Sequence, residues 1–150
     1  MRSPDPQIPG DETLFRTVNP DHCTGDRVMY FDKREEMGTS VIRSSYVRSV
    51  DECFDRVRRP SESALAHTTP DRVPREVDAP PGEPWELRVC DDPTPESIAH
   101  AEIRPYRPKA TKFTRPSKDG QKAAIRAAIV TAFRVLRAGD QISAFGTRLD

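Results

Sequence analysis

The stretch Trp85-Glu86-Leu87-Arg88-Val89-Cys90 decides the fold class, because its apolar and polar side chains alternate as they do along a half-buried β-strand. Asp91-Asp92-Pro93 predicts a turn directly after it. A second alternating stretch, Ile98 to Tyr106, predicts a further strand. One face of that strand carries Ala99, Ala101 and Ile103, and the other carries His100, Glu102, Arg104 and Tyr106.

Three more strands are predicted nearer the N-terminus, where β-branched and aromatic residues cluster. They cover Leu14–Val18, Arg27–Phe31 and Val41–Val47.

Helix signals lie in two places. Ser49 and Glu52 have the spacing of a capping box, which predicts a short helix over about 49–59, before Pro60. Ser117 as a cap and Gly139 as a stop predict a long C-terminal helix over about 117–138. Together these elements predict an α+β fold, in which a small, mostly antiparallel sheet is packed by one short and one long helix.

The chain of 150 residues has the size of one domain. Its 15 prolines are about twice the average usage, so long irregular connections are expected. We expect a disordered lead-in at residues 1–12 and a single domain at 13–138 with a proline-rich loop at 60–84. A C-terminal tail is expected at 139–150.

The cysteines are odd in number and widely spaced, at Cys23, Cys53 and Cys90. This pattern gives no disulfide framework and favours a reducing compartment. Residues 1–10 contain three prolines and no apolar core, so they do not resemble a secretory signal or an anchor. No window approaches the 18 or so apolar residues of a membrane span. We therefore expect a cytoplasmic protein with no membrane partner.

Charge is distributed unevenly along the chain, although the formal net charge is zero. Residues 1–103 hold 13 Lys/Arg against 21 Asp/Glu, and residues 104–150 hold 11 Lys/Arg against 3 Asp/Glu. This asymmetry favours a charged partner. Two other outcomes stay open: the acidic part neutralises the basic part within one molecule, or it binds the basic part of a second copy and gives a homo-oligomer.

From residue 104 onward, cations alternate with two aromatic residues. The first interpretation is a non-enzymatic binding module for an anionic partner such as nucleic acid, with cations on phosphates and rings stacked on unpaired bases. The contacts expected are Tyr106, Arg107, Lys109, Lys112, Phe113, Arg115, Lys118, Lys122 and Arg126. The alternative is a solvated helix face and a surface loop, whose Lys and Arg stems cover apolar surface.

The tripeptide His100-Ala101-Glu102 begins like the zinc-deaminase motif, but no cysteine follows Cys90 to complete that metal site. His100 and Glu102 share a strand face with Arg104. The competing hypothesis is therefore a small hydrolase or transferase, with His100 as a general base oriented by a carboxylate and Arg104 holding an anionic substrate. Arg16 is a further candidate. The plain alternative is an exposed polar strand face with a weak ion pair.

Neither a metal nor a cofactor is expected from the sequence. His22 and Cys23 are adjacent, and adjacent residues seldom bind one ion. The seven glycines are scattered, without dinucleotide or Walker spacing, and no G-x-S-x-G is present.

Four short motifs occur in order along the chain: Leu14-Phe15-Arg16, Ser44-Ser45-Tyr46, Ser49-Val50-Asp51 and Ala99-His100-Ala101-Glu102-Ile103. In this order they resemble a family of small uncharacterised bacterial proteins of unknown function, over residues 13–104. The resemblance implies no activity, cofactor or site residue, and the basic C-terminal helix lies outside it.

Overall fold

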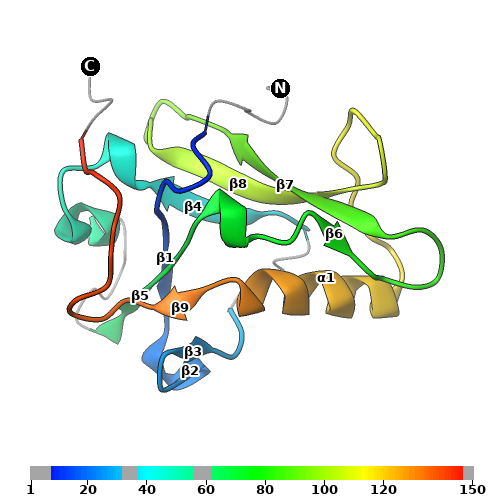
Figure 1. Ribbon diagram of the computed structural model, residues 1–150, viewed down its shortest axis with the longest axis horizontal. Helices are drawn as coiled ribbons and strands as arrows, with labels where there is room; N and C mark the ends of the chain where they lie inside the picture. Colours follow the sequence, from blue (N-terminus) through cyan, green and yellow to red (C-terminus); the bar gives the residue numbers. More distant parts are fainter. Residues whose placement is uncertain (1–7, 32–36, 56–61, 147–150) are drawn as a thin grey trace.

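The computed structural model describes residues 8–31, 37–55 and 62–146. These residues form an α+β domain, in which a curled antiparallel sheet is accompanied by the helix α1 (Asp119–Thr131) (Figure 1). The predicted fold class and the antiparallel sheet are confirmed. No helix in the described part of the chain has the length and apolar character needed to cross a bilayer.

The sheet has the strand order β2-β3-β9-β5-β1-β4-β8-β7-β6, and every neighbouring pair is antiparallel. The strands are β1 (Leu14–Val18), β2 (Cys23–Thr24), β3 (Arg27–Val28), β4 (Thr39–Arg43), β5 (Ala64–Thr68), β6 (Glu76–Val77), β7 (Trp85–Asp91), β8 (His100–Tyr106) and β9 (Arg134–Val135). Short 3₁₀ turns cover Pro20–His22, Ser44–Tyr46, Val50–Phe54 and Pro70–Arg72.

Apolar side chains pack on both faces of the sheet, because successive residues of a strand point in opposite directions. Leu14 belongs to the larger core, which also contains Ile125 and Ile129 of α1. Phe15, the next residue, belongs to a smaller core on the other face. There its ring stacks on that of Phe145 at 5.9 Å between centroids. The strand alternation predicted at Leu14–Val18 therefore decides which core each residue enters.

The prediction of a long C-terminal helix over 117–138 is wrong. The helix α1 ends at Thr131, whose hydroxyl donates to the carbonyls of Ala127 and Ala128. The chain then turns and forms β9, which pairs with both β3 and β5. The expected serine cap is also absent, since Lys118 occupies the N-cap position without a side-chain hydrogen bond. Pairing of residues 134–135 with β3 and β5 outweighs the helical pattern of the sequence here.

The predicted short helix over about 49–59 is a 3₁₀ turn, Val50–Phe54, within the described residues. The capping box does not form as expected, because Ser49 makes no side-chain cap hydrogen bond. Glu52 instead accepts a hydrogen bond from the backbone N–H of Arg48, at 2.5 Å. Residues 56–59 lie outside the described residues.

The ordered domain extends beyond the boundaries expected for it. Residues 1–7 of the lead-in lie outside the described residues, but Ile8 and Glu12 are buried. The region expected to be a proline-rich loop at 60–84 contains β5 in the interior of the sheet and β6 at its edge. In the expected tail, Ser143 exchanges two hydrogen bonds with Thr13, so this segment is part of the packed structure.

Candidate functional site

The pairing of β4 with β8 positions the polar side chains of the candidate site. Ser40 lies opposite Glu102 and Ile42 lies opposite His100. Residues directly opposite each other project from the same face of a sheet, so Ser40, Glu102 and His100 are diagonal or direct neighbours on one face. Asp92 follows β7 at the start of the connection to β8, and its backbone N–H donates to the carbonyl of His100 at 3.1 Å.

The hydrogen bonds of His100 fix which ring nitrogen carries the proton in the neutral imidazole. Nδ1 lies 2.8 Å from the main-chain oxygen of Asp92 and 3.2 Å from its Oδ2. A carbonyl oxygen only accepts, so Nδ1 must be the protonated nitrogen. Nε2 then presents its lone pair to the hydroxyl of Ser40, 3.2 Å away. The result is a chain from the Ser40 hydroxyl through the His100 imidazole to the main-chain oxygen of Asp92, with the Asp92 carboxylate beside it.

The two other predicted catalytic residues, Glu102 and Arg104, surround this chain. Arg104 Nε donates to Glu102 Oε1 at 2.8 Å, and Arg104 Nη2 lies 3.2 Å from Asp92 Oδ2. Burial alone would lower the pKa of Arg104, but the hydrogen bond to Glu102 and the negative charges of Glu102 and Asp92 together outweigh burial and raise that pKa. The guanidinium therefore remains charged and fixes both carboxylates. It is not the open clamp for an anionic substrate that we expected from the sequence.

Gly38 permits the approach of Glu102 to the start of β4. The backbone φ of Gly38 is +121°, which residues with a Cβ atom rarely adopt. A Cβ atom added at this position would lie 3.2 Å from Glu102 Oε1.

A pocket of about 280 Å³ opens beside this cluster. It lies where β1 and β4 separate: the two strands pair only at Leu14–Arg43 and Phe15–Ile42. Ser40 and His100 line the pocket together with Arg16, Phe31 and Ile42. Arg16 Nη1 donates to the main-chain oxygen of Ser40 at 2.8 Å, and its guanidinium lies 4.6 Å from the centre of the Phe31 ring. A cationic donor group thus stands in the same pocket as the Ser40–His100 pair.

Asp92, His100 and Glu102 also offer three potential metal-ligand atoms within 4.8 Å of one another. Both carboxylates, however, already contact the guanidinium of Arg104. A divalent cation would have to share these oxygens with a fixed positive charge at close range, which opposes its binding. We therefore assign the cluster to hydrogen bonding and ion pairing.

A larger hollow of about 700 Å³ lies between the N-terminal segment and the strands β6 and β7. Its lining includes Ile8, Asp71, Arg75, Glu76 and Arg88, and among the described residues that line it there is no histidine, serine, cysteine or lysine. Nucleophilic chemistry needs a nucleophile beside a base, so the smaller pocket is the better candidate for catalysis.

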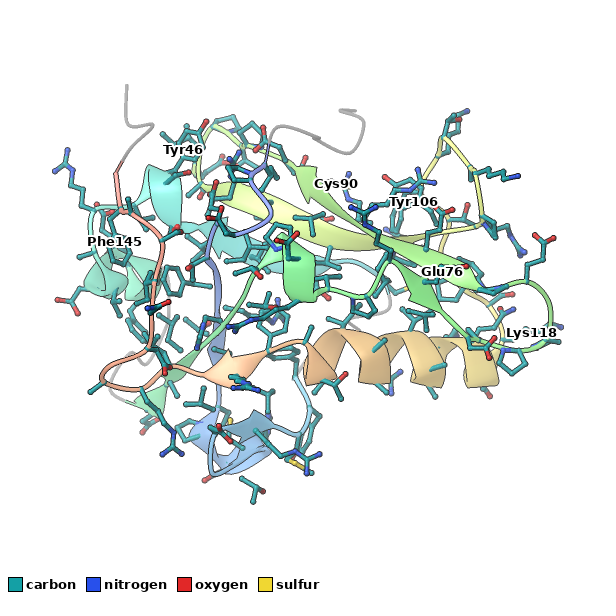
Figure 2. All side chains as sticks on the ribbon, in the orientation of Figure 1. Tyr46, Glu76, Cys90, Tyr106, Lys118 and Phe145 are labelled. Carbon is teal, nitrogen blue, oxygen red and sulfur yellow. The ribbon has the colours of Figure 1, made fainter. Side chains whose placement is uncertain are left out.

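The residues predicted to contact an anionic partner are only partly brought together. Arg107, Lys109, Lys112, Arg115 and Lys118 are exposed along the connection between β8 and α1. Lys122 and Arg126 lie half-buried on α1 itself. The connection is the loop that leaves β8 and returns to α1, with Lys118 at its end (Figures 1 and 2).

Tyr106 cannot serve as the open stacking platform predicted for it. It is 1% exposed, and its hydroxyl lies 3.5 Å from Cys90 Sγ on the neighbouring strand (Figure 2). The guanidinium of Arg88 covers its ring at 4.0 Å. Burial, followed by the contact with Cys90, raises the pKa of Tyr106 to about 12. The alternation along the strand predicts that this ring lies on the polar face. The sequence does not show that the Arg88 side chain covers the ring on that face.

Phe113, the other expected stacking platform, is half-buried. The guanidinium groups of Arg104 and Arg115 each lie 5.7 Å from the centre of its ring. Two arginine side chains therefore lie against this ring, and the ring is not free to stack on a nucleic-acid base.

Sequence reasoning missed Ser40 and Asp92. Asp92 is part of a turn signal but of no site motif, and Ser40 belongs to no motif. Ser40 reaches His100 only through the register of β4 on β8, and Asp92 only through the turn after β7. Comparison of the chain with models of protein families, with curated proteins and with solved structures finds no match. The resemblance of residues 13–104 to small bacterial proteins therefore stays a prediction from short motifs.

Proposed function

We propose that the protein is a small hydrolase or transferase in which Ser40 is the nucleophile and His100 is the general base. The observation that carries the proposal is the hydrogen-bonded chain from Ser40 Oγ to His100 Nε2, and from His100 Nδ1 to Asp92. A nucleophile bonded to a base that is oriented by a third group is the arrangement that activates a hydroxyl. This proposal develops the candidate site predicted at His100, Glu102 and Arg104.

The chemistry that this arrangement supports is acyl transfer. As Ser40 Oγ bonds to the carbonyl carbon of an ester, its proton passes to His100 Nε2. Collapse of the tetrahedral intermediate breaks the bond to the leaving alkoxide, which takes that proton from His100. A water molecule or another hydroxyl then attacks the acyl-Ser40 ester through the same base, and Ser40 is released with its proton. Water makes the reaction a hydrolysis, and another hydroxyl makes it a transfer.

The pocket walls indicate the kind of acyl group that fits. Phe31 and Ile42 line the pocket with apolar groups, and Arg16 supplies a positive charge. A positive donor near the reacting carbonyl stabilises the negative charge that develops on its oxygen. The volume of about 280 Å³ is slightly below the usual range for small-molecule sites, which favours short esters.

The test compares wild type with Ser40→Ala and His100→Asn, using hydrolysis of p-nitrophenyl acetate and butyrate. The matched control is Ser117→Ala, at an exposed serine outside the site. We expect the two site variants to lose about 10²- to 10⁴-fold in rate, the usual contribution of a positioned base and its nucleophile, and the control to keep its rate.

A fluorophosphonate probe provides a readout that does not depend on the choice of ester. We expect it to label the peptide that contains Ser40 in wild type and Ser117→Ala, and to leave Ser40→Ala unlabelled. Equal hydrolysis by all four proteins, or equal labelling of Ser40→Ala, would overturn the proposal. A cytoplasmic location belongs to this proposal and rests on the cysteine usage of the sequence.

A further inference from the structure

The connection between β8 and α1 is a cationic segment, which we define as residues 107–118. It contains Arg107, Lys109, Lys112, Arg115 and Lys118 and no acidic residue, and all five cations are exposed. The proposed active site makes no use of any of them.

No carboxylate in the described part of the chain forms an ion pair with these cations. Within the described residues, Arg43, Arg88 and Arg104 each have a carboxylate oxygen within 3.2 Å. The five side chains of the cationic segment form no ion pair there. The carboxylate of Glu86 accepts a hydrogen bond from the backbone N–H of Lys109 and interacts with the charge of that lysine without forming an ion pair. The positive charge of this segment is therefore available to a partner.

Contacts within the cationic segment and with Trp85 also restrain the conformation of the segment. The guanidinium of Arg107 lies 5.1 Å from the centre of the Trp85 ring, and that of Arg115 lies 5.7 Å from the Phe113 ring. The backbone N–H of Ala110 donates to the carbonyl of Arg107 and closes a turn, in which Lys109 has a φ of +60°. A guanidinium over a ring keeps its edge N–H groups directed outward, so less conformational entropy is lost when it binds phosphate.

The chemistry of the segment favours phosphates of nucleic acid over a lipid surface. Binding to a membrane interface usually adds an apolar side chain that enters the lipid. The large apolar side chains that are exposed in the described residues, Met29, Tyr30 and Ile98, belong to other parts of the chain. Phe113, the aromatic residue of the segment, lies beneath two arginines, and the neighbouring Tyr106 is buried, so neither ring is free to stack on a base.

We propose that the cationic segment binds the phosphate backbone of nucleic acid without selecting a base sequence. Contacts from five cations release bound counterions, so the affinity depends steeply on salt. For duplex DNA the logarithm of the association constant falls with the logarithm of salt concentration by about 0.9 for each phosphate neutralised, and for single strands by about 0.7. Five contacts therefore predict a slope of about −4.5 on duplex DNA.

The experiment measures fluorescence anisotropy of labelled oligonucleotides of about 20 nucleotides, single-stranded and duplex, in two unrelated sequences, between about 50 and about 200 mM salt. The test variants replace Lys109, Lys112 and Lys118 by Gln, and then all five cations by Gln. The control variant replaces Arg27, Arg48 and Arg137, which are exposed elsewhere, by Gln. Circular dichroism checks that each variant is folded.

We expect wild type to bind both sequences equally, and the slope on duplex DNA to become shallower by about 0.9 for each cation removed from the segment. The control variant should keep the wild-type slope. Absence of binding at low salt, an equal change in the control, or binding to anionic phospholipid vesicles but not to oligonucleotides would overturn the proposal. The proposal would also be overturned if size-exclusion chromatography showed that salt changes only the self-association of the protein. Ester hydrolysis by the five-cation variant should equal that of wild type, which keeps this test separate from the proposed function.

Discussion

The guanidinium of Arg43 donates to both carboxylate oxygens of Glu12, from Nε at 3.0 Å and from Nη2 at 2.9 Å. Arg43 is 1% exposed, and its third nitrogen lies 3.2 Å from Asp91 Oδ1. Ser45 adds a hydroxyl hydrogen bond to Glu12 at 2.8 Å. The N-terminal segment, the end of β4 and the end of β7 are joined at this point, close to the turn that carries Asp92.

Breaking this ion pair from one side should destabilise the fold strongly. Glu12→Ala leaves the buried guanidinium of Arg43 with only Asp91, and we expect the free energy of unfolding to fall by about 3–5 kcal/mol. The double variant Glu12→Gln with Arg43→Met should recover part of that loss, because it removes the buried charge as well. Urea denaturation measures both. The matched control is Glu86→Gln, which breaks the more exposed pair with Arg88 and should cost about 0–1 kcal/mol. Equal losses for Glu12→Ala and Glu86→Gln would contradict the prediction.

The same carboxylate should make the protein sensitive to acid. Burial alone would raise the pKa of Glu12, but the hydrogen bonds from Arg43 and Ser45 and the charge of Arg43 together outweigh burial and hold that pKa below its ordinary value of 4.5. The folded state therefore favours the ionised form. Its contribution to stability is fully present above the unfolded pKa and is lost as the pH falls through the folded pKa. Urea midpoints across the acid range should drop below pH 4.5 in wild type, and less steeply in Glu12→Gln.

A control separates this effect from that of His67. Burial lowers the pKa of His67 from 6.5 in spite of the nearby Asp140, so its contribution is also lost toward acid, but beginning at a higher pH. His67→Gln should therefore reduce the loss of stability that begins as the pH falls below 6.5, whereas Glu12→Gln should reduce the loss that begins below pH 4.5. An unchanged loss below pH 4.5 in Glu12→Gln would contradict the assignment.

Part of the fold was predictable because alternation survives in the sequence. The predicted strand Leu14–Val18 matches β1, and the stretch from Trp85 to Cys90 matches β7 apart from one residue. The strand β5 was not predictable: its sequence, Ala64-Leu65-Ala66-His67-Thr68, has two alanines and lies among prolines. Its burial between β1 and β9 stabilises it as a strand, and that is a tertiary effect.

The candidate site, like the fold, could be predicted only in part from the sequence. Alternation placed His100, Glu102 and Arg104 on one face, as β8 has them. The partners of His100 come from long-range pairing, since Ser40 is 60 residues away. The helix α1 ends early for a similar reason: the backbone N–H of Leu136 donates to the carbonyl of Leu65 at 2.7 Å, and no local pattern encodes that contact.

The three cysteines should differ in reactivity. Burial, with smaller effects of the carboxylates of Glu52 and Asp55, raises the pKa of Cys53 to about 12. Cys90 is also buried, and its pKa is raised by burial. Cys23 is half-exposed, so it is the thiol that reagents reach. Iodoacetamide should modify Cys23 in the native protein and all three residues after denaturation, as mass spectrometry of tryptic peptides would show. Rapid native modification of Cys53 would contradict this.

Replacing Asp92 by Asn should affect ester hydrolysis much less than replacing His100. In the proposed mechanism Asp92 orients His100, but its main-chain oxygen, 2.8 Å from Nδ1, remains after the substitution and still fixes the proton on that nitrogen. We therefore expect Asp92→Asn to lower kcat/KM by at most about 10-fold, and His100→Asn by about 10²- to 10⁴-fold. Asp51→Asn, at an exposed carboxylate outside the site, is the control. A loss in Asp92→Asn as large as that in His100→Asn would mean that the carboxylate, and not the carbonyl, orients the base.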